Sequence, residues 1–208
     1  MQTPQRPVPG VIEHARFAAL ALLLAAGAAQ ARPETFRLDP VHTRVAFQVS
    51  HAGFSNPVAT FSQVEGELQF DEADWSTATL DVRIPIATLD LGDADWQAKI
   101  LDRTFFDAEK FPQARFVSTR VEPVDATHAR VTGALTLRGI TRPVTLEVTL
   151  NALRRHPLTF RRTAGFSATG TLRRSDFGMD AWKSVVGDEV KLIIEVEAQR
   201  GGDDAPAQ

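Results

Sequence analysis

The side chains that could perform chemistry are few in this chain, and their spacing does not bring them together. His42 and His51 lie nine residues apart, and His128 and His156 fall in turn-like or exposed contexts. A metal site needs three or four converging ligands, and neither an H-x-H nor an H-E-x-x-H spacing occurs. Cysteine is absent and no serine stands in a nucleophile-elbow context. The sequence therefore predicts neither a metal site nor a catalytic residue.

Asp39 and His42 form the pair that comes nearest to an acid–base couple. Because no nucleophile accompanies them, we interpret His42 as the partner in a hydrogen bond at the edge of a strand. We therefore expect a protein that is not an enzyme. A net charge of only -3 over 208 residues also argues against nucleic acid as a partner.

Apolar residues, rather than polar ones, carry the regular pattern of this sequence. Every second residue from Val190 to Ala198 is apolar, and the same alternation recurs in at least six other stretches. A period of two places the apolar side chains on one face of a β-strand. The predicted strands are Thr35–Leu38 with Thr43–Ser50, Val58–Phe70, Thr77–Ile86, Ala114–Val121, Ala129–Arg138, Thr141–Leu150, Thr163–Arg173 and Glu189–Gln199.

Short connections between these strands favour antiparallel pairing, with a tight hairpin at Arg138-Gly139-Ile140. Seven or eight strands with one apolar face each must stack as two sheets or close into a barrel. Small residues such as Gly133, Ala168 and Gly170 share the apolar faces, and they leave volume that neighbours or a ligand must fill. Together with 13 phenylalanines and no tyrosine, this favours a hollow barrel.

Two segments depart from the alternation. Leu91–Asp102 has apolar residues nearer to helical spacing, with Asp93 or Asp95 as the helix N-cap. Met179–Val185 is expected to form one helical turn. A bulge is expected within Val58–Phe70, because Phe61 is out of step with the later apolar residues.

Residues 1–31 differ in composition from the rest of the chain. Arg16 precedes an apolar run that begins at Phe17, and Ala29-Gln30-Ala31 forms an A-x-A cleavage signature. The run of about 13 residues is too short to span a bilayer and is typical of a secretory signal peptide. We predict export to a bacterial periplasm, a mature domain over residues 32–200 without a membrane segment, and a disordered tail over residues 201–208.

Several motifs taken together resemble the YceI-like family. The motifs are Leu38–Phe47 followed by His51-Ala52-Gly53, Gly66–Asp71, Phe105–Asp107 with Phe111-Pro112 and Ala114–Phe116, Gly133–Val144, Arg174–Met179 and Val186–Val190. They span about residues 34–199 in the order and spacing of the family. The resemblance implies an all-β fold, a single extended eight-stranded antiparallel lipocalin-like barrel with one or two short helices.

The resemblance also implies an elongated apolar cavity that holds a long isoprenoid or similar lipid chain. The chain departs from the family pattern at Gly53–Ala59 and Gly92–Trp96, which are both candidates for the cavity mouth. The headgroup preference of the family is therefore not carried over. Arg173, Arg174 and Lys183 could meet a phosphate headgroup near the rim, although we favour their interpretation as ordinary surface cations.

The expected function is that of a periplasmic carrier for a long-chain isoprenoid, an isoprenoid quinone or a related amphiphile, with no cofactor besides that lipid. The alternative is a non-catalytic envelope module that has a filled barrel and binds a protein partner through its rim. A homodimer is left open. Trp96 and Trp182 could cover the mouth or could only anchor their short helices. The residues expected to bind the ligand are Phe47, Phe54, Phe61, Phe105, Phe106, Phe111, Phe116, Phe166, Phe177, Met179 and Trp182.

Overall fold

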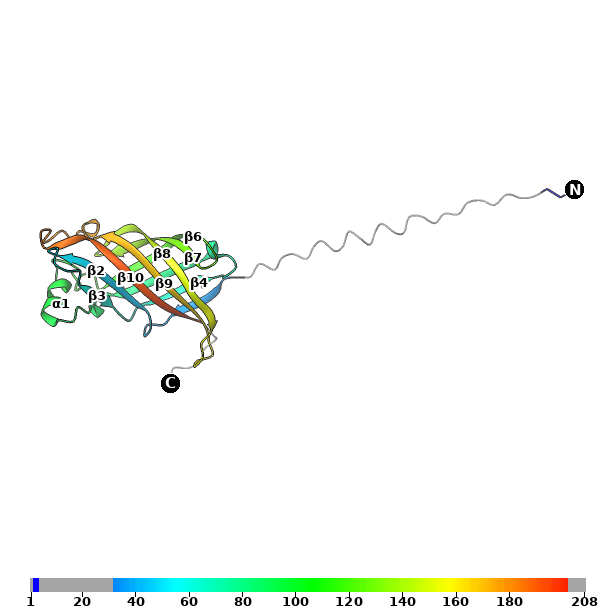
Figure 1. The fold of residues 1–208 in the computed structure, drawn as a ribbon, viewed down its shortest axis with the longest axis horizontal. Helices are drawn as coiled ribbons and strands as arrows, with labels where there is room; N and C mark the ends of the chain where they lie inside the picture. Colours follow the sequence, from blue (N-terminus) through cyan, green and yellow to red (C-terminus); the bar gives the residue numbers. More distant parts are fainter. Residues whose placement is uncertain (1, 4–31, 202–208) are drawn as a thin grey trace. The chain divides into compact units, whose positions relative to one another are not determined.

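The computed structural model describes residues 2–3 and 32–201, so the expected leader and nearly all of the expected tail lie outside the described residues. Long antiparallel strands wrap around a common axis (Figure 1). The strands are β1 Glu34–Leu38, β2 Arg44–His51, β3 Val58–Phe61, β4 Glu65–Phe70, β5 Thr79–Pro85, β6 Gln113–Pro123, β7 His128–Leu137, β8 Ile140–Arg155, β9 Arg162–Arg173 and β10 Val186–Arg200.

The ten strand segments close into a ring of eight strands, which confirms the predicted barrel. β1 and β2 both pair with β10, β1 through Leu38 opposite Ala198 and β2 through Val45 opposite Ile194, so they act as one interrupted strand. β3 and β4 pair in turn with β2 and β1 and form the second interrupted strand. Because β1 pairs with both β4 and β10, the sheet has no free edge at this point and the barrel is closed.

The interruption between β3 and β4 is a break in the strand, not the bulge that the sequence analysis expected. Phe61 and Val64 are both buried although they are three residues apart. Gln63 adopts a positive φ of 54°, which turns the chain so that both apolar side chains can point inward. A second difference concerns Met179–Val185, where the structure has a hydrogen-bonded turn around Trp182 and no helix.

Other local predictions are confirmed. The β7–β8 hairpin turns through Arg138 and Gly139 with positive φ angles of 52° and 74°, as expected of a type I′ turn that matches the strand twist. Helix α1 spans Ala94–Leu101, and the Asp93 side chain caps it by accepting a hydrogen bond from the N–H of Trp96 at 2.8 Å. Within residues 2–3 and 32–201, no helix is both long and apolar enough to cross a bilayer. Three short 3₁₀-helices complete the fold: η1 Trp75–Thr77, η2 Ile86–Thr88 and η3 Arg174–Phe177.

Glycines on the inner face make room for large side chains of the neighbouring strand. A Cβ atom on Gly133 of β7 would overlap the ring of Phe116 on β6 and would lie 2.7 Å from the carbonyl oxygen of Val117. A Cβ atom on Gly170 of β9 would lie 2.8 Å from a methyl group of Leu146. The volume beside these two glycines is therefore filled by neighbouring side chains.

We predict that Gly133→Ala lowers the free energy of unfolding by about 1–3 kcal/mol, because the Phe116 ring has to leave its position. Urea unfolding measures the loss. Gly165→Ala on β9 is the matched control, since the nearest atom to its new Cβ would be the Ala152 carbonyl oxygen at 4.0 Å. If both variants are equally stable, the packing of Phe116 over Gly133 does not constrain the barrel.

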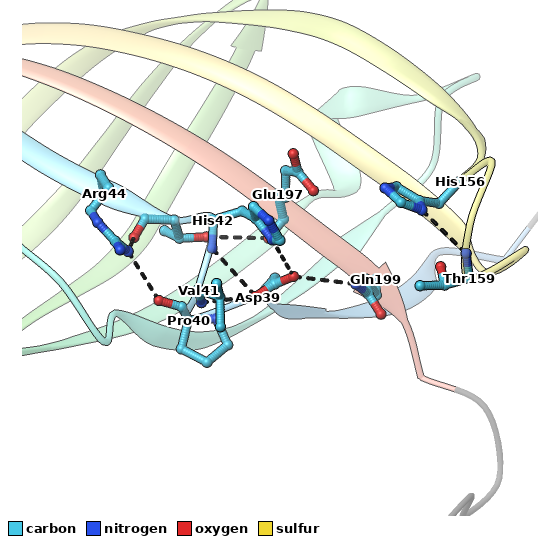
Figure 2. Close-up of polar contacts among 10 residues, drawn as sticks. Asp39, Pro40, Val41, His42, Arg44, His156, Thr159, Glu197 and Gln199 are labelled. Carbon is cyan, nitrogen blue, oxygen red and sulfur yellow. Dashed lines mark hydrogen bonds and ion pairs between the residues drawn. The ribbon is translucent and has the colours of Figure 1, made fainter.

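A polar network ties the break between β1 and β2 to the neighbouring strand β10 (Figure 2). The backbone N–H of Asp39 donates to the carbonyl oxygen of Glu197 at 2.8 Å, and the Thr43 hydroxyl donates to the same oxygen at 3.2 Å. Asp39 Oδ2 lies 2.8 Å from His42 Nδ1 and accepts a hydrogen bond from the Gln199 amide at 3.3 Å. We refer to these five residues as the seam.

The Asp39–His42 pair makes the stability of the seam depend on pH. Burial acts to raise the pKa of the Asp39 carboxyl, but hydrogen bonds from His42 and from the N–H groups of Val41 and His42 outweigh it and lower this pKa. The hydrogen bond to Asp39, together with its charge, raises the pKa of His42. The stabilisation of the folded state by the Asp39 carboxylate is therefore present above about pH 3.9, the pKa of this group in the unfolded chain. It is lost as the pH falls through the pKa that the group has in the folded protein. The stabilisation of the folded state by the charged His42 imidazole is complete below about pH 6.5, and it is lost as the pH rises through the pKa of His42 in the folded protein.

We predict that His42→Gln lowers the free energy of unfolding more at about pH 5.5 than at about pH 8.5, because Asp39 favours the charged imidazole. Urea unfolding of the protein and the variant at both pH values measures this difference. In an Asp39→Asn background the same substitution should vary much less with pH. An equal effect of His42→Gln at the two pH values in the unaltered background would contradict the role of the pair.

Candidate functional site

The interior of the barrel contains an apolar cavity of about 540 Å³. All ten strand segments contribute side chains to its wall, and these side chains are almost entirely aliphatic or aromatic. The volume falls within the range of small-molecule sites, about 300–1,000 Å³. The alternation in the sequence explains the lining, since each strand turns one apolar face toward the axis. An apolar surface of this kind binds a ligand because the hydrocarbon part of the ligand is transferred out of water.

One end of the cavity is closed by aromatic rings. Phe70 of β4, Trp75 of η1 and Phe166 of β9 pack edge to face, with ring centroids 5.1 Å apart for Phe70–Trp75 and 5.4 Å apart for Phe70–Phe166. Less than a tenth of the surface of Phe70 and of Trp75 is exposed. This aromatic end therefore offers a ligand mostly apolar contacts, together with the indole N–H of Trp75, which has no hydrogen-bond partner among the described residues.

The opposite end, which we call the α1 end, is where the ionisable lining residues collect. Helix α1 lies at this end of the barrel (Figure 1), and the ring of Trp96 on α1 packs edge-on against His51 at the end of β2, with centroids 6.1 Å apart. The polar residues on this part of the wall are Ser50, His51, Lys99, Asp102, Thr104 and Arg174. The cavity is thus asymmetric, with its ionisable side chains at one end.

Eight of the eleven residues expected to bind a ligand lie on the cavity wall. They are Phe47, Phe61, Phe105, Phe106, Phe116, Phe166, Met179 and Trp182. Phe47, Phe61 and Phe106 form a cluster in which the Phe47–Phe61 centroids are 5.7 Å apart and the Phe61–Phe106 centroids 5.6 Å apart. Trp182 is 63% exposed and adopts a positive φ of 56°, so it lies at the rim and extends into solvent.

The other three expected residues lie away from the cavity. Phe54 is 90% exposed in the loop after β2. Phe111 packs against Gly139 at the β7–β8 hairpin, and Phe177 of η3 is 1% exposed within packed core outside the cavity. Phe54 and Phe111 lie in loops and Phe177 in a short 3₁₀-helix, where no alternation fixes the direction of a side chain.

The sequence analysis did not place Phe70 and Trp75 in the cavity, although both line it. Phe70 shares its alternation with Leu68 and Val64, so the pattern contained the signal for it. Trp75 lies in a short 3₁₀-helix between strands, where no periodic signal exists.

The three basic residues that could meet a headgroup differ in their positions. The side chains of Arg173 and Lys183 are 72% and 68% exposed, and they lie near Asp188 and Asp180 respectively, as expected of surface cations. Arg174 is only 4% exposed and lines the cavity at the α1 end. The interpretation of Arg174 as a surface cation is therefore wrong, because the first residues of β10 and Met179 cover it.

Asp39, His42 and Glu197 bring three groups of metal-ligand type within 4.8 Å of one another. Both carboxylate oxygens of Asp39 already take part in hydrogen bonds, Oδ1 with the N–H of Val41 at 2.8 Å and Oδ2 with His42. The contacts of the seam therefore account for the positions of the Asp39 and His42 side chains in this arrangement. The cluster lies outside the cavity lining.

A closed antiparallel barrel built around an open apolar interior defines the class of β-barrel proteins with an internal binding cavity. Residues 36–198 match the model of the YceI-like domain, and the chain belongs to the YceI-like family. A UPF0312 protein of Pseudomonas putida (strain W619) is 39% identical over 184 residues, which are 87% of this chain and 95% of that protein. A UPF0312 protein of Photorhabdus laumondii is 34% identical over 180 residues, 86% of this chain and 93% of that protein.

Solved structures have the same fold. Burkholderia cenocepacia BcnA superposes with a TM-score of 0.67 at 27% identity over 74% of this chain and 95% of that chain. The Campylobacter jejuni YceI protein gives a TM-score of 0.67 at 27% identity, over 72% of this chain and 88% of that chain. A polyisoprenoid binding domain from Saccharophagus degradans gives 0.59 at 12% identity, over 82% and 100% of the two chains, and at this identity supports the fold alone.

Proposed function

We propose that this protein is a non-catalytic carrier that holds a long-chain isoprenoid or a related single-chain amphiphile inside its barrel. The observation that carries the proposal is the open apolar cavity of about 540 Å³. A barrel whose own side chains filled the interior would instead favour a module that binds protein partners through its rim. The Saccharophagus degradans domain of the same fold is described as polyisoprenoid binding, which is consistent with this ligand class.

The energetics support a ligand held mainly by its tail. Burial of about ten methylene groups contributes roughly 8 kcal/mol at about 0.8 kcal/mol each, and association costs offset part of this. A longer chain reaches micromolar affinity or better without any charged contact. The aromatic end suits the tail terminus and the α1 end suits the polar head, because the ionisable lining residues lie there.

A periplasmic location is part of the proposal. It rests on the leader-like composition of residues 1–31, with the A-x-A signature at Ala29-Gln30-Ala31, and on the absence of cysteine. Expression of the full chain in a bacterial host, followed by osmotic shock, should release a shortened protein into the periplasmic fraction. Retention of the full-length chain in the cytoplasm would contradict the location.

The carrier function is tested on protein purified from that fraction. Native mass spectrometry and organic extraction should recover a chain-like lipid, and the emptied protein should take up an added polyprenol. Protein that carries no lipid and takes up no polyprenol would overturn the proposed function.

We predict that Ala168→Phe weakens polyprenol binding by about tenfold or more, which corresponds to about 1.4 kcal/mol. Ala168 is buried on β9 and lines the cavity, so a phenyl ring there occupies volume that the tail needs. Thr169→Phe is the matched control, because Thr169 is exposed on the next position of the same strand. Fluorescence titration measures both affinities, and equal affinity of the two variants would exclude this part of the cavity from the ligand site.

A further inference from the structure

Arg174 is a buried cation on the cavity wall. It begins η3 directly after β9, at the α1 end. Its guanidinium carbon lies 6.0 Å from the ring centroid of Phe105, which also lines the cavity. Full burial of a charge is costly unless an opposite charge or a set of hydrogen bonds compensates it. The partners of this guanidinium therefore decide what it does.

Three backbone carbonyl groups hold the guanidinium in position. Nε donates to the carbonyl oxygen of Gly187 and one terminal nitrogen to that of Val186, both at 2.8 Å. The other terminal nitrogen donates to the carbonyl oxygen of Met179. A guanidinium has five N–H groups, so each terminal nitrogen keeps one N–H without an acceptor among residues 32–201. Such a pair of terminal N–H groups is the donor set that binds a carboxylate or phosphate.

The nearby carboxylates are engaged elsewhere. Asp188 accepts hydrogen bonds from the backbone N–H and the hydroxyl of Ser175 at 3.0 and 2.9 Å. Asp180 lies 2.8 Å from the ammonium group of Lys183. Burial lowers the pKa of Arg174, while the charges of Asp188 and Asp180 act in the opposite direction. The carbonyl groups thus fix the guanidinium, but no carboxylate among the described residues is hydrogen-bonded to it.

We propose that Arg174 is the anchor for an anionic headgroup, a phosphate monoester or a carboxylate, on the amphiphile that occupies the cavity. The proposal rests on the proposed carrier function and adds the chemistry of the ligand head to it. Its position at the α1 end directs the head toward the mouth and the tail toward Phe70, Trp75 and Phe166. Arg174 therefore distinguishes ligands of equal chain length by their charge.

The experiment compares a polyprenyl monophosphate with the free polyprenol of the same chain length. The unaltered protein should bind the phosphate at least about tenfold more tightly, since hydrogen bonds to charged groups are the stronger class. Arg174→Gln should abolish this preference, because the affinity for the phosphate falls much more than the affinity for the polyprenol. Arg173→Gln is the matched control, because it removes an exposed cation one residue away and should keep the preference. A fatty acid and its alcohol form a second pair that separates carboxylate from phosphate binding.

A purely structural Arg174, one that only holds Met179 and the start of β10 in place, predicts a different result. Arg174→Gln would then weaken both ligands equally and keep any preference, which would overturn the proposal. If that variant does not fold, the guanidinium ¹⁵N resonance of Arg174 in the unaltered protein gives the answer. A shift on addition of the phosphate but not of the polyprenol supports the anchor, and the absence of a shift overturns it.

The same data separate the two proposals. Binding of the polyprenol without a preference for the phosphate removes the anchor and leaves the carrier function intact. Failure of the unaltered protein to bind either ligand removes the carrier function and the anchor with it.

Discussion

Closure of the backbone hydrogen-bond ladder is the constraint on which the rest of this structure depends. β1 pairs with β4 on one side and with β10 on the other, so the wall is held by main-chain hydrogen bonds around the whole ring. Protein interiors are normally filled to crystal-like density by their own side chains. Here the ladder fixes the wall independently of what lies inside, and a cavity of about 540 Å³ can persist.

The fold could be predicted from the sequence to the extent that it depends on alternation and local turns. The period of two located the strands, the Arg138-Gly139 turn located a hairpin, and Asp93 located the start of α1. The break at Gln63 could not be predicted, because a bulge and a break both shift the apolar register by one residue. The turn around Trp182 likewise depends on hydrogen bonds that no short sequence pattern specifies.

The candidate site was less accessible to prediction. Phenylalanines within strands, such as Phe47 and Phe166, follow the alternation and line the cavity. Phe54 and Phe177 lie in connecting segments, and one is exposed while the other is packed away from the cavity. The burial of Arg174 depends on Met179 and on the first residues of β10, up to thirteen residues further along the chain, whose carbonyl groups accept its N–H groups. The sequence around an arginine does not indicate whether a more distant segment of the chain buries it.

The separation of wall and lining has a consequence for how such a protein can change. The ladder is made of main-chain groups, whereas the bore of the tube is set by side chains such as Ala168 and Phe61. Substitutions of inward-facing residues can therefore alter the length and width of the cavity without disturbing strand pairing. Glycines such as Gly133 are exceptions, because there is no room for a side chain at these positions. Ligand selectivity in this scaffold is in that sense an evolvable trait, largely uncoupled from topology.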